Sequence, residues 1–146
     1  MSADAIDGTG FGGSGETGPI VAIRQFVDAF NSNDVDRARA ACADETRIID
    51  DIPPHEWAGP GAIAGWFRDL ARLSAEYEMS HIAVTLKEAR HVVVTERMAY
   101  VVVPIDVRWL DHGTAEARTG AMTCALREEP DGWRISALAW TWSVSG

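Results

Sequence analysis

Apolar residues recur at helical spacing in three stretches of the first half of the chain, and they predict three helices. The first is expected over residues 20–31, with Pro19 at its first position and an apolar face of Ile20, Ile23, Val27 and Phe30. The second is expected from a cap at Asp34 to about residue 43, with a stripe of Val35, Ala38 and Cys42. The third is expected over residues 61–74, with an apolar face of Ile63, Trp66, Phe67, Leu70 and Leu73.

The second half of the chain changes to a period of two, which is typical of strands with one buried face. Alternation begins near residue 79 and is clearest in residues 98–110, where one face is wholly apolar: Ala99, Val101, Val103, Ile105, Val107 and Trp109. Further strands are expected at residues 119–127 and 133–143, and a short one at residues 45–50. Helices first and strands last predict an α+β fold in which a curved antiparallel sheet wraps over the N-terminal helices.

Length and composition restrict the organisation and the partners of the protein. A chain of 146 residues, 47% of them hydrophobic, suits one domain, expected over residues 19–146. The net charge of −9, with basic residues scattered along the chain, argues against nucleic acid and anionic lipid as partners. The first basic residue is Arg24 and no apolar run approaches the roughly 18 residues of a membrane span, so a cytoplasmic location without membrane contact is expected.

Residues 1–18 contain the glycine spacing G-x-G-x-x-G twice, but they lack the preceding strand that a dinucleotide site requires. We therefore expect a flexible glycine-rich tail here and not a phosphate-binding loop. The four histidines lie in separate elements without metal-ligand spacing, and Cys42 and Cys124 are far apart with alanine neighbours, as interior cysteines often are. Neither a metal nor a cofactor is expected.

Three segments resemble the SnoaL-like proteins of the nuclear transport factor two-like superfamily, which includes relatives of polyketide cyclases and ketosteroid isomerases. The resemblance covers about residues 19–143 and rests on VAIRQFVDAFNSNDVD, IIDDIPPHEWAGPGAIAGW and GAMTCALREEPDGWRISALAWTW. It implies a cone-shaped α+β barrel with a pocket between the concave sheet and the helices, commonly in a homodimer formed through the sheet. Members range from isomerases, dehydratases, hydrolases and cyclases to binding proteins, so the resemblance leaves the activity open.

Two adjacent carboxylates, Asp50 and Asp51, end the short strand and are the first candidates for chemistry. Adjacent residues of a regular strand face opposite sides, so at most one is expected in a pocket, and periodicity does not decide which. On the family resemblance we expect Asp50. In an apolar pocket it would serve as a catalytic base, because burial raises its pKa; the alternative is that it caps the turn that follows. His55 is either its proton-relay partner or a solvated loop residue.

Asp106 is the second candidate base, in the middle of the strand of residues 98–110 and opposite its apolar face. If the apolar face packs on the helices, Asp106 points to the convex side and pairs with Arg108 or an interface arginine. If Tyr100 and Asp106 instead face the cavity, with the apolar face in a dimer interface, Asp106 is a base and Tyr100 a ligand contact. His81 is a weaker candidate of the same kind.

Tryptophan occurs six times, and each residue could bring a large apolar surface and one N–H donor to a cavity wall. The candidates for binding a small hydrophobic ligand are Trp57, Trp66, Trp140 and Trp142, with core packing as the alternative for each. Two functions are thus consistent with the sequence: cofactor-free proton transfer by an isomerase, lyase or cyclase, or a non-catalytic ligand-binding or dimerisation module. A convergent carboxylate and a second polar group in the cavity would favour the first.

Overall fold

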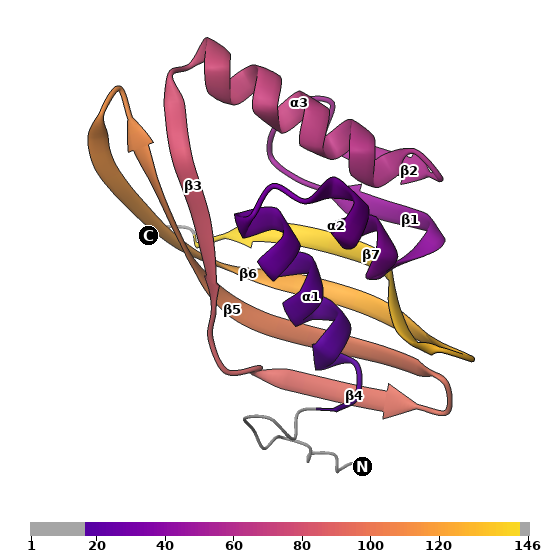
Figure 1. Cartoon of the computed structure of the whole chain (residues 1–146). Helices are drawn as coiled ribbons and strands as arrows, with labels where there is room; N and C mark the ends of the chain where they lie inside the picture. Colours follow the sequence, from indigo (N-terminus) through magenta and orange to yellow (C-terminus); the bar gives the residue numbers. More distant parts are fainter. Residues whose placement is uncertain (1–16, 144–146) are drawn as a thin grey trace.

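The computed structural model describes residues 17–143, and Figure 1 shows their arrangement in three helices and seven strands. The helices are α1 (Ile20–Asn31), α2 (Val35–Ala40) and α3 (Ala62–Glu76). The strands are β1 (Cys42–Ile49), β2 (Glu56–Gly59), β3 (Met79–Leu86), β4 (His91–Thr95), β5 (Met98–Asp111), β6 (Thr114–Glu129) and β7 (Gly132–Trp142). The predicted tail lies almost entirely outside the described residues.

One curved sheet, in the order β2-β1-β7-β6-β5-β3, forms the main layer, and β4 pairs with β5 beside this path. Strands β3 to β7 pair antiparallel, as the sequence predicted, whereas β1 runs parallel to β7. The long strands bend, and the three helices lie on the concave side of the sheet (Figure 1). The predicted α+β fold, a cone-shaped barrel with a curved sheet around N-terminal helices, is confirmed.

The segment after the second helix differs from the prediction. Asp34 caps α2 as expected, because its side chain accepts a hydrogen bond from the backbone N–H of Arg37 at 3.1 Å. The helix ends earlier than expected, however, and Cys42 begins β1 instead of completing the helical stripe. The cause is pairing with a distant strand, since the backbone N–H of Ile135 in β7 donates to the carbonyl of Ala41 at 2.9 Å. Tertiary hydrogen bonds here override the local helical pattern.

The apolar face of β5 packs toward the helices. Its buried residues are Ala99, Val101, Val103, Ile105 and Val107. Aromatic rings from α1, α3 and β7 form a cluster within the same core, and those of Trp66 and Trp140 stack with their centroids 5.6 Å apart. Because side chains alternate along a strand, Tyr100 and Asp106 lie on the convex face of the sheet.

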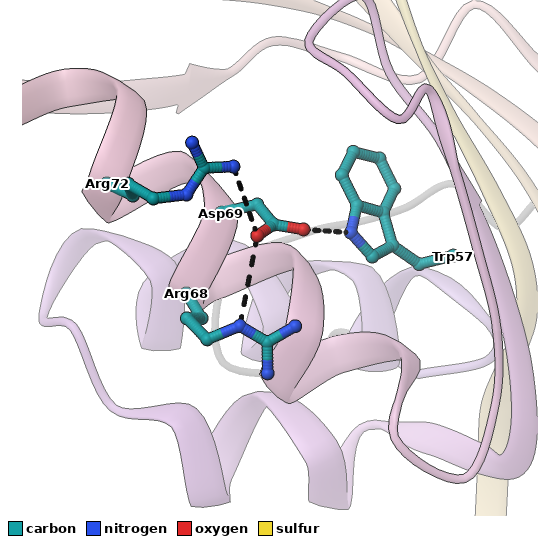
Figure 2. A network of polar contacts seen from close by, with 4 residues as sticks. All are labelled: Trp57, Arg68, Asp69 and Arg72. Carbon is teal, nitrogen blue, oxygen red and sulfur yellow. Dashed lines mark hydrogen bonds and ion pairs between the residues drawn. The ribbon is translucent and has the colours of Figure 1, made fainter. Parts of the chain in front are cut away.

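A polar network fixes the edge strand β2 against α3. The indole N–H of Trp57 donates to Asp69 Oδ2 at 2.9 Å, and Arg68 and Arg72 approach the other carboxylate oxygen, as Figure 2 shows. The indole hydrogen bond, and to a smaller extent the two arginines, hold the pKa of Asp69 below its usual value. A Cβ added to Gly65 would lie 3.3 Å from the indole ring of Trp57, so the glycine leaves room for this ring. The network anchors the far end of the loop that follows β1.

Candidate ligand-binding site

A cavity of about 140 Å³ lies between the concave face of the sheet and the helices α1 and α3. Its wall is mainly apolar and is formed by Phe30, Ile52, Trp66, Leu70, Met79, Ile82, Val84, Val107, Trp109, Trp140 and Trp142. Three charged residues complete the lining, namely Asp50, Asp51 and Arg118. A concave, mostly apolar site with a few polar groups is typical of small-molecule pockets.

Asp50 is the buried charged residue of the cavity, with an exposure of 8%. It directly follows β1, whose alternation places it inside, since Ile48 is buried whereas Ile49 is 51% exposed. Both carboxylate oxygens accept hydrogen bonds, Oδ2 from the indole N–H of Trp66 at 2.8 Å and Oδ1 from the backbone N–H of Asp51 at 2.7 Å. Two neutral donors thus hold the carboxyl group in one orientation.

Burial raises the pKa of Asp50 to about 6, because an ionised carboxylate loses its water of hydration in an apolar cavity. The hydrogen bonds from Trp66 and from the backbone of Asp51 act in the opposite direction, and the negative charge of Asp51 adds to the increase. At neutral pH the group is mostly ionised, yet it lies close to its pKa. Such a carboxyl group is suited both to accept and to return a proton, as general acid–base catalysis requires.

Asp51 and Arg118 form the rim of the cavity, because they are its two exposed lining residues. Their side chains are 54% and 47% exposed, and Arg118 Nη1 lies 3.7 Å from Asp51 Oδ2. The guanidinium also lies over Trp142, with its central carbon 4.8 Å from the ring centroid. The prediction that at most one of the adjacent aspartates lines the pocket is wrong, because β1 ends at Ile49 and strand alternation does not constrain the loop.

His55 lies in this loop but does not line the cavity. Its ring Nδ1 is 3.1 Å from the backbone oxygen of Asp50, and the backbone N–H of Asp50 donates to the carbonyl of His55 at 3.1 Å. These contacts close the turn. The structure therefore brings the imidazole to the backbone of Asp50 and not to its carboxylate, which does not fit a proton relay.

Asp106 and Tyr100 lie on the convex face of β5, outside the cavity. Asp106 Oδ1 is 3.1 Å from the ammonium nitrogen of Lys87, so its partner is a lysine and not the predicted Arg108. Tyr100 is 47% exposed and packs its ring against His91. The alternative in which this face of β5 lines the pocket is wrong, because the apolar face of the strand already packs in the core. The weaker candidate, His81, is exposed as well.

Three of the four tryptophan candidates line the cavity: Trp66, Trp140 and Trp142. Trp57 does not, because its indole packs against α3. Trp109 and Arg118 line the cavity but were not among the candidates. A signal for both existed, since Trp109 shares the buried face of β5 with Val107, and Arg118 is the cross-strand partner of Val107.

Within residues 17–143, histidine, cysteine, aspartate and glutamate side chains do not gather in a group of three that could hold a metal ion. Cys42 and Cys124 are buried and are not joined to each other. None of the helices in the described part of the chain is long and apolar enough to cross a membrane. The ionisable groups of the cavity are thus the two aspartates and the arginine of its lining.

The curved sheet around three helices and the mainly apolar cavity between them define the class, a cone-shaped α+β protein. The family model of the SnoaL-like domain matches residues 23–137. The chain therefore belongs to the SnoaL-like domain family, within the superfamily that its sequence segments resemble.

Solved structures share this fold at low sequence identity. A nuclear transport factor 2-like superfamily protein from Salmonella enterica has a TM-score of 0.70 and 16% identity, over 86% of this chain and 88% of its own. A nuclear transport factor 2-like protein with a cystatin-like fold from Novosphingobium aromaticivorans has a TM-score of 0.69 and 18% identity, over 86% and 80%. A ketosteroid isomerase-like protein from Erwinia carotovora has a TM-score of 0.67 and 17% identity, over 86% and 94%. A search of curated proteins finds no match.

Proposed function

We propose that the protein binds a small apolar molecule in this cavity and catalyses the transfer of a proton between two of its carbon atoms. Asp50 acts as the acid–base group, and no cofactor takes part. Isomerisation, dehydration and cyclisation of enolisable compounds are reactions of this kind. The observation that carries the proposal is the Asp50 carboxyl group, which is 8% exposed in an apolar cavity, with its pKa raised to about 6 by burial. One structural relative is described as ketosteroid isomerase-like, which agrees with this class of reaction.

The proposed step conserves atoms and electrons within the ligand and Asp50. The carboxylate takes a proton from a carbon next to a carbonyl group, and the electron pair of that C–H bond moves into the carbonyl to form an enolate. The same carboxyl group then returns the proton to a different carbon of the conjugated system. The hydrogen bond from Trp66 keeps the carboxylate in place during both transfers, and the apolar walls limit the access of water.

The proposal is tested with cyclohex-3-enone, a single-ring ketone whose double bond becomes conjugated when a proton moves. We expect the protein to accelerate the appearance of the conjugated enone, measured by its ultraviolet absorbance, with a rate that rises with pH through about 6 because the base must be ionised. Asp50→Asn should abolish the acceleration, and Asp106→Asn, on the convex face, should retain it. Binding without acceleration above the buffer rate would instead favour the alternative, a non-catalytic binding module.

A specific observation also favours self-association as part of the function. Large apolar side chains are exposed along β4 and the start of β5, namely Val92, Val93, Val94, Met98 and Tyr100. Val93, Met98 and Tyr100 lie on the convex face of the sheet, and Val92 and Val94 lie on the opposite face. Exposed apolar side chains on both faces of one sheet edge favour a protein partner there. The homodimer through the sheet is therefore part of the proposal. The cytoplasmic location stays a prediction from the sequence.

A further inference from the structure

We infer that the ligand of this cavity is a single-ring compound that carries a carboxylate, and that Arg118 binds this carboxylate at the rim. The inference rests on the proposed function, because it names the class of ligand that the same site takes. Among the described residues that line the cavity, Arg118 alone is basic. A cation at the mouth of an apolar site favours ligands with an anionic group at the matching position.

The sheet places Arg118 over the cavity. In the register of β5 and β6 it lies opposite Val107, a buried residue of the cavity wall, so its side chain leaves the sheet on the concave side. Two residues further along β6, Gly120 is the partner of Trp142 in β7. A Cβ on Gly120 would lie 2.8 Å from the ring of Trp142, so the glycine allows this ring to lie close against β6. The ring in turn supports the guanidinium group of Arg118.

The guanidinium group has donors available for a ligand. Its distance of 3.7 Å to Asp51 exceeds that of a hydrogen bond, and within residues 17–143 the Arg118 side chain donates none. Both side chains of this ion pair are about half exposed, and exposed ion pairs contribute little to the free energy of folding. A ligand carboxylate would form two parallel charge-assisted hydrogen bonds with the guanidinium and replace the weaker contact. The contact with the Trp142 ring holds the guanidinium group at the rim before the ligand arrives.

The volume of the cavity limits the body of the ligand. Its value of about 140 Å³ is close to the roughly 150 Å³ of an apolar protein cavity that accommodates benzene. The walls include the indole rings of Trp66, Trp109 and Trp140, which suit a flat ring. One ring therefore fits beside Asp50 with its carboxylate at the rim, whereas a fused pair of rings requires the walls to move.

Three probes that share one ring and differ in charge test the inference: benzoate, benzamide and benzylamine. Their dissociation constants are measured by isothermal titration calorimetry at pH 7.5. We expect benzoate to bind at least tenfold more tightly than benzamide. Benzoate should also bind more tightly than benzylamine, whose ammonium group Arg118 repels although the two aspartates attract it. 2-Naphthoate should bind at least tenfold more weakly than benzoate.

Variants of the arginine assign the effect to its guanidinium group. Arg118→Gln should weaken the binding of benzoate at least tenfold and so remove its preference over benzamide. Arg118→Lys keeps the charge without the planar fork and should retain part of the preference. Arg108→Gln, an exposed position of β5 outside the cavity lining, is the matched control and should change neither affinity. If Arg118→Gln does not fold, the Arg118→Lys variant provides the test. An undiminished preference for benzoate in Arg118→Lys would contradict bidentate binding by the guanidinium group.

The outcomes separate this inference from the proposed function. Equal affinities for benzoate and benzamide, a preference for benzylamine, or an unchanged preference in Arg118→Gln would overturn the inference while the proposed proton transfer stands. Tight binding of 2-naphthoate would overturn the single-ring limit. Binding of none of the probes would count against both. Preferential binding of benzoate by a protein that does not isomerise cyclohex-3-enone would support the inference and reject the proposed chemistry.

Discussion

Replacement of Asp50 by asparagine tests the electrostatic argument directly. In the folded protein burial raises the pKa of this group to about 6 from its ordinary value of 3.8. Below pH 3.8 the carboxyl group is protonated in both the folded and the unfolded chain. As the pH rises through 6, the folded protein must ionise a buried group that the unfolded chain has already ionised in water. The wild-type protein thus has a stabilising contribution that is present at low pH and is lost as the pH rises through about 6.

The size of the effect follows from the two pKa values and the hydrogen bonds. A difference of about two pKa units corresponds to about 3 kcal/mol in the free energy of unfolding. Asparagine does not ionise and avoids this cost. It has one acceptor oxygen where the carboxylate has two, so either the Trp66 indole or the backbone N–H of Asp51 loses its partner, at about 1–3 kcal/mol. At pH 7.5 the net effect of Asp50→Asn should lie between no change and a gain of about 2 kcal/mol.

Urea denaturation of wild type and Asp50→Asn at pH 4 and pH 7.5 measures this contribution. The difference in the free energy of unfolding, wild type minus variant, should fall by about 2 kcal/mol between the two pH values, less than the full effect because the unfolded carboxyl group is partly ionised at pH 4. The other carboxylates titrate in both proteins, so their contributions to the free energy of unfolding cancel in this difference. Asp106→Asn, a partly exposed control outside the cavity, should follow wild type within about 0.5 kcal/mol. Parallel pH profiles, or a variant clearly less stable at pH 7.5, would refute the reasoning.

Trp66→Phe removes a donor that stabilises the ionised form of Asp50, so the pKa of Asp50 should rise above about 6. The ¹³C chemical shift of the Asp50 carboxyl group, measured during a pH titration, reports this pKa. An unchanged or lower midpoint would contradict the argument. Gly120→Ala should lower stability by about 1–3 kcal/mol in thermal melts, because its Cβ would lie 2.2 Å from a backbone oxygen of β7 and 2.8 Å from the Trp142 ring. Gly61→Ala, where a Cβ meets open space, should stay within about 1 kcal/mol of wild type, and equal losses at both positions would count against the steric argument. Sedimentation equilibrium should give twice the chain mass of 15.9 kDa, and a single-chain mass at micromolar concentration would reject the dimer.

The long elements were predictable because their patterns are repeated many times within one segment. In β5 five apolar residues at every second position, from Ala99 to Val107, are all buried, as the alternation predicted. In α1 the apolar spacing predicted the helix over the residues that form it. Hydrophobic burial favours these patterns wherever the segment packs, so a local signal suffices.

The short segments around the site were not predictable in the same way. Cys42 fits a helical stripe, but the hydrogen bond between Ala41 and Ile135 draws this segment into β1. The adjacent aspartates both line the cavity because the strand ends at Ile49, a boundary that periodicity does not define. Each of these outcomes depends on backbone partners that are distant in the chain.

The sequence by itself determined the α+β class, the place of the three helices ahead of the long antiparallel strands, the wholly apolar face of β5, and a carboxylate at the end of the first strand as the candidate for chemistry. Only the tertiary structure decided that Asp50 lies beside the indole of Trp66 in a cavity, that Trp57 turns away to Asp69, and that Arg118 lies at the rim. The physical reason is that periodicity reports which side of its own element a residue occupies. The loss of water that raises a pKa, and the partners that a charged group meets, depend on where separate elements come together.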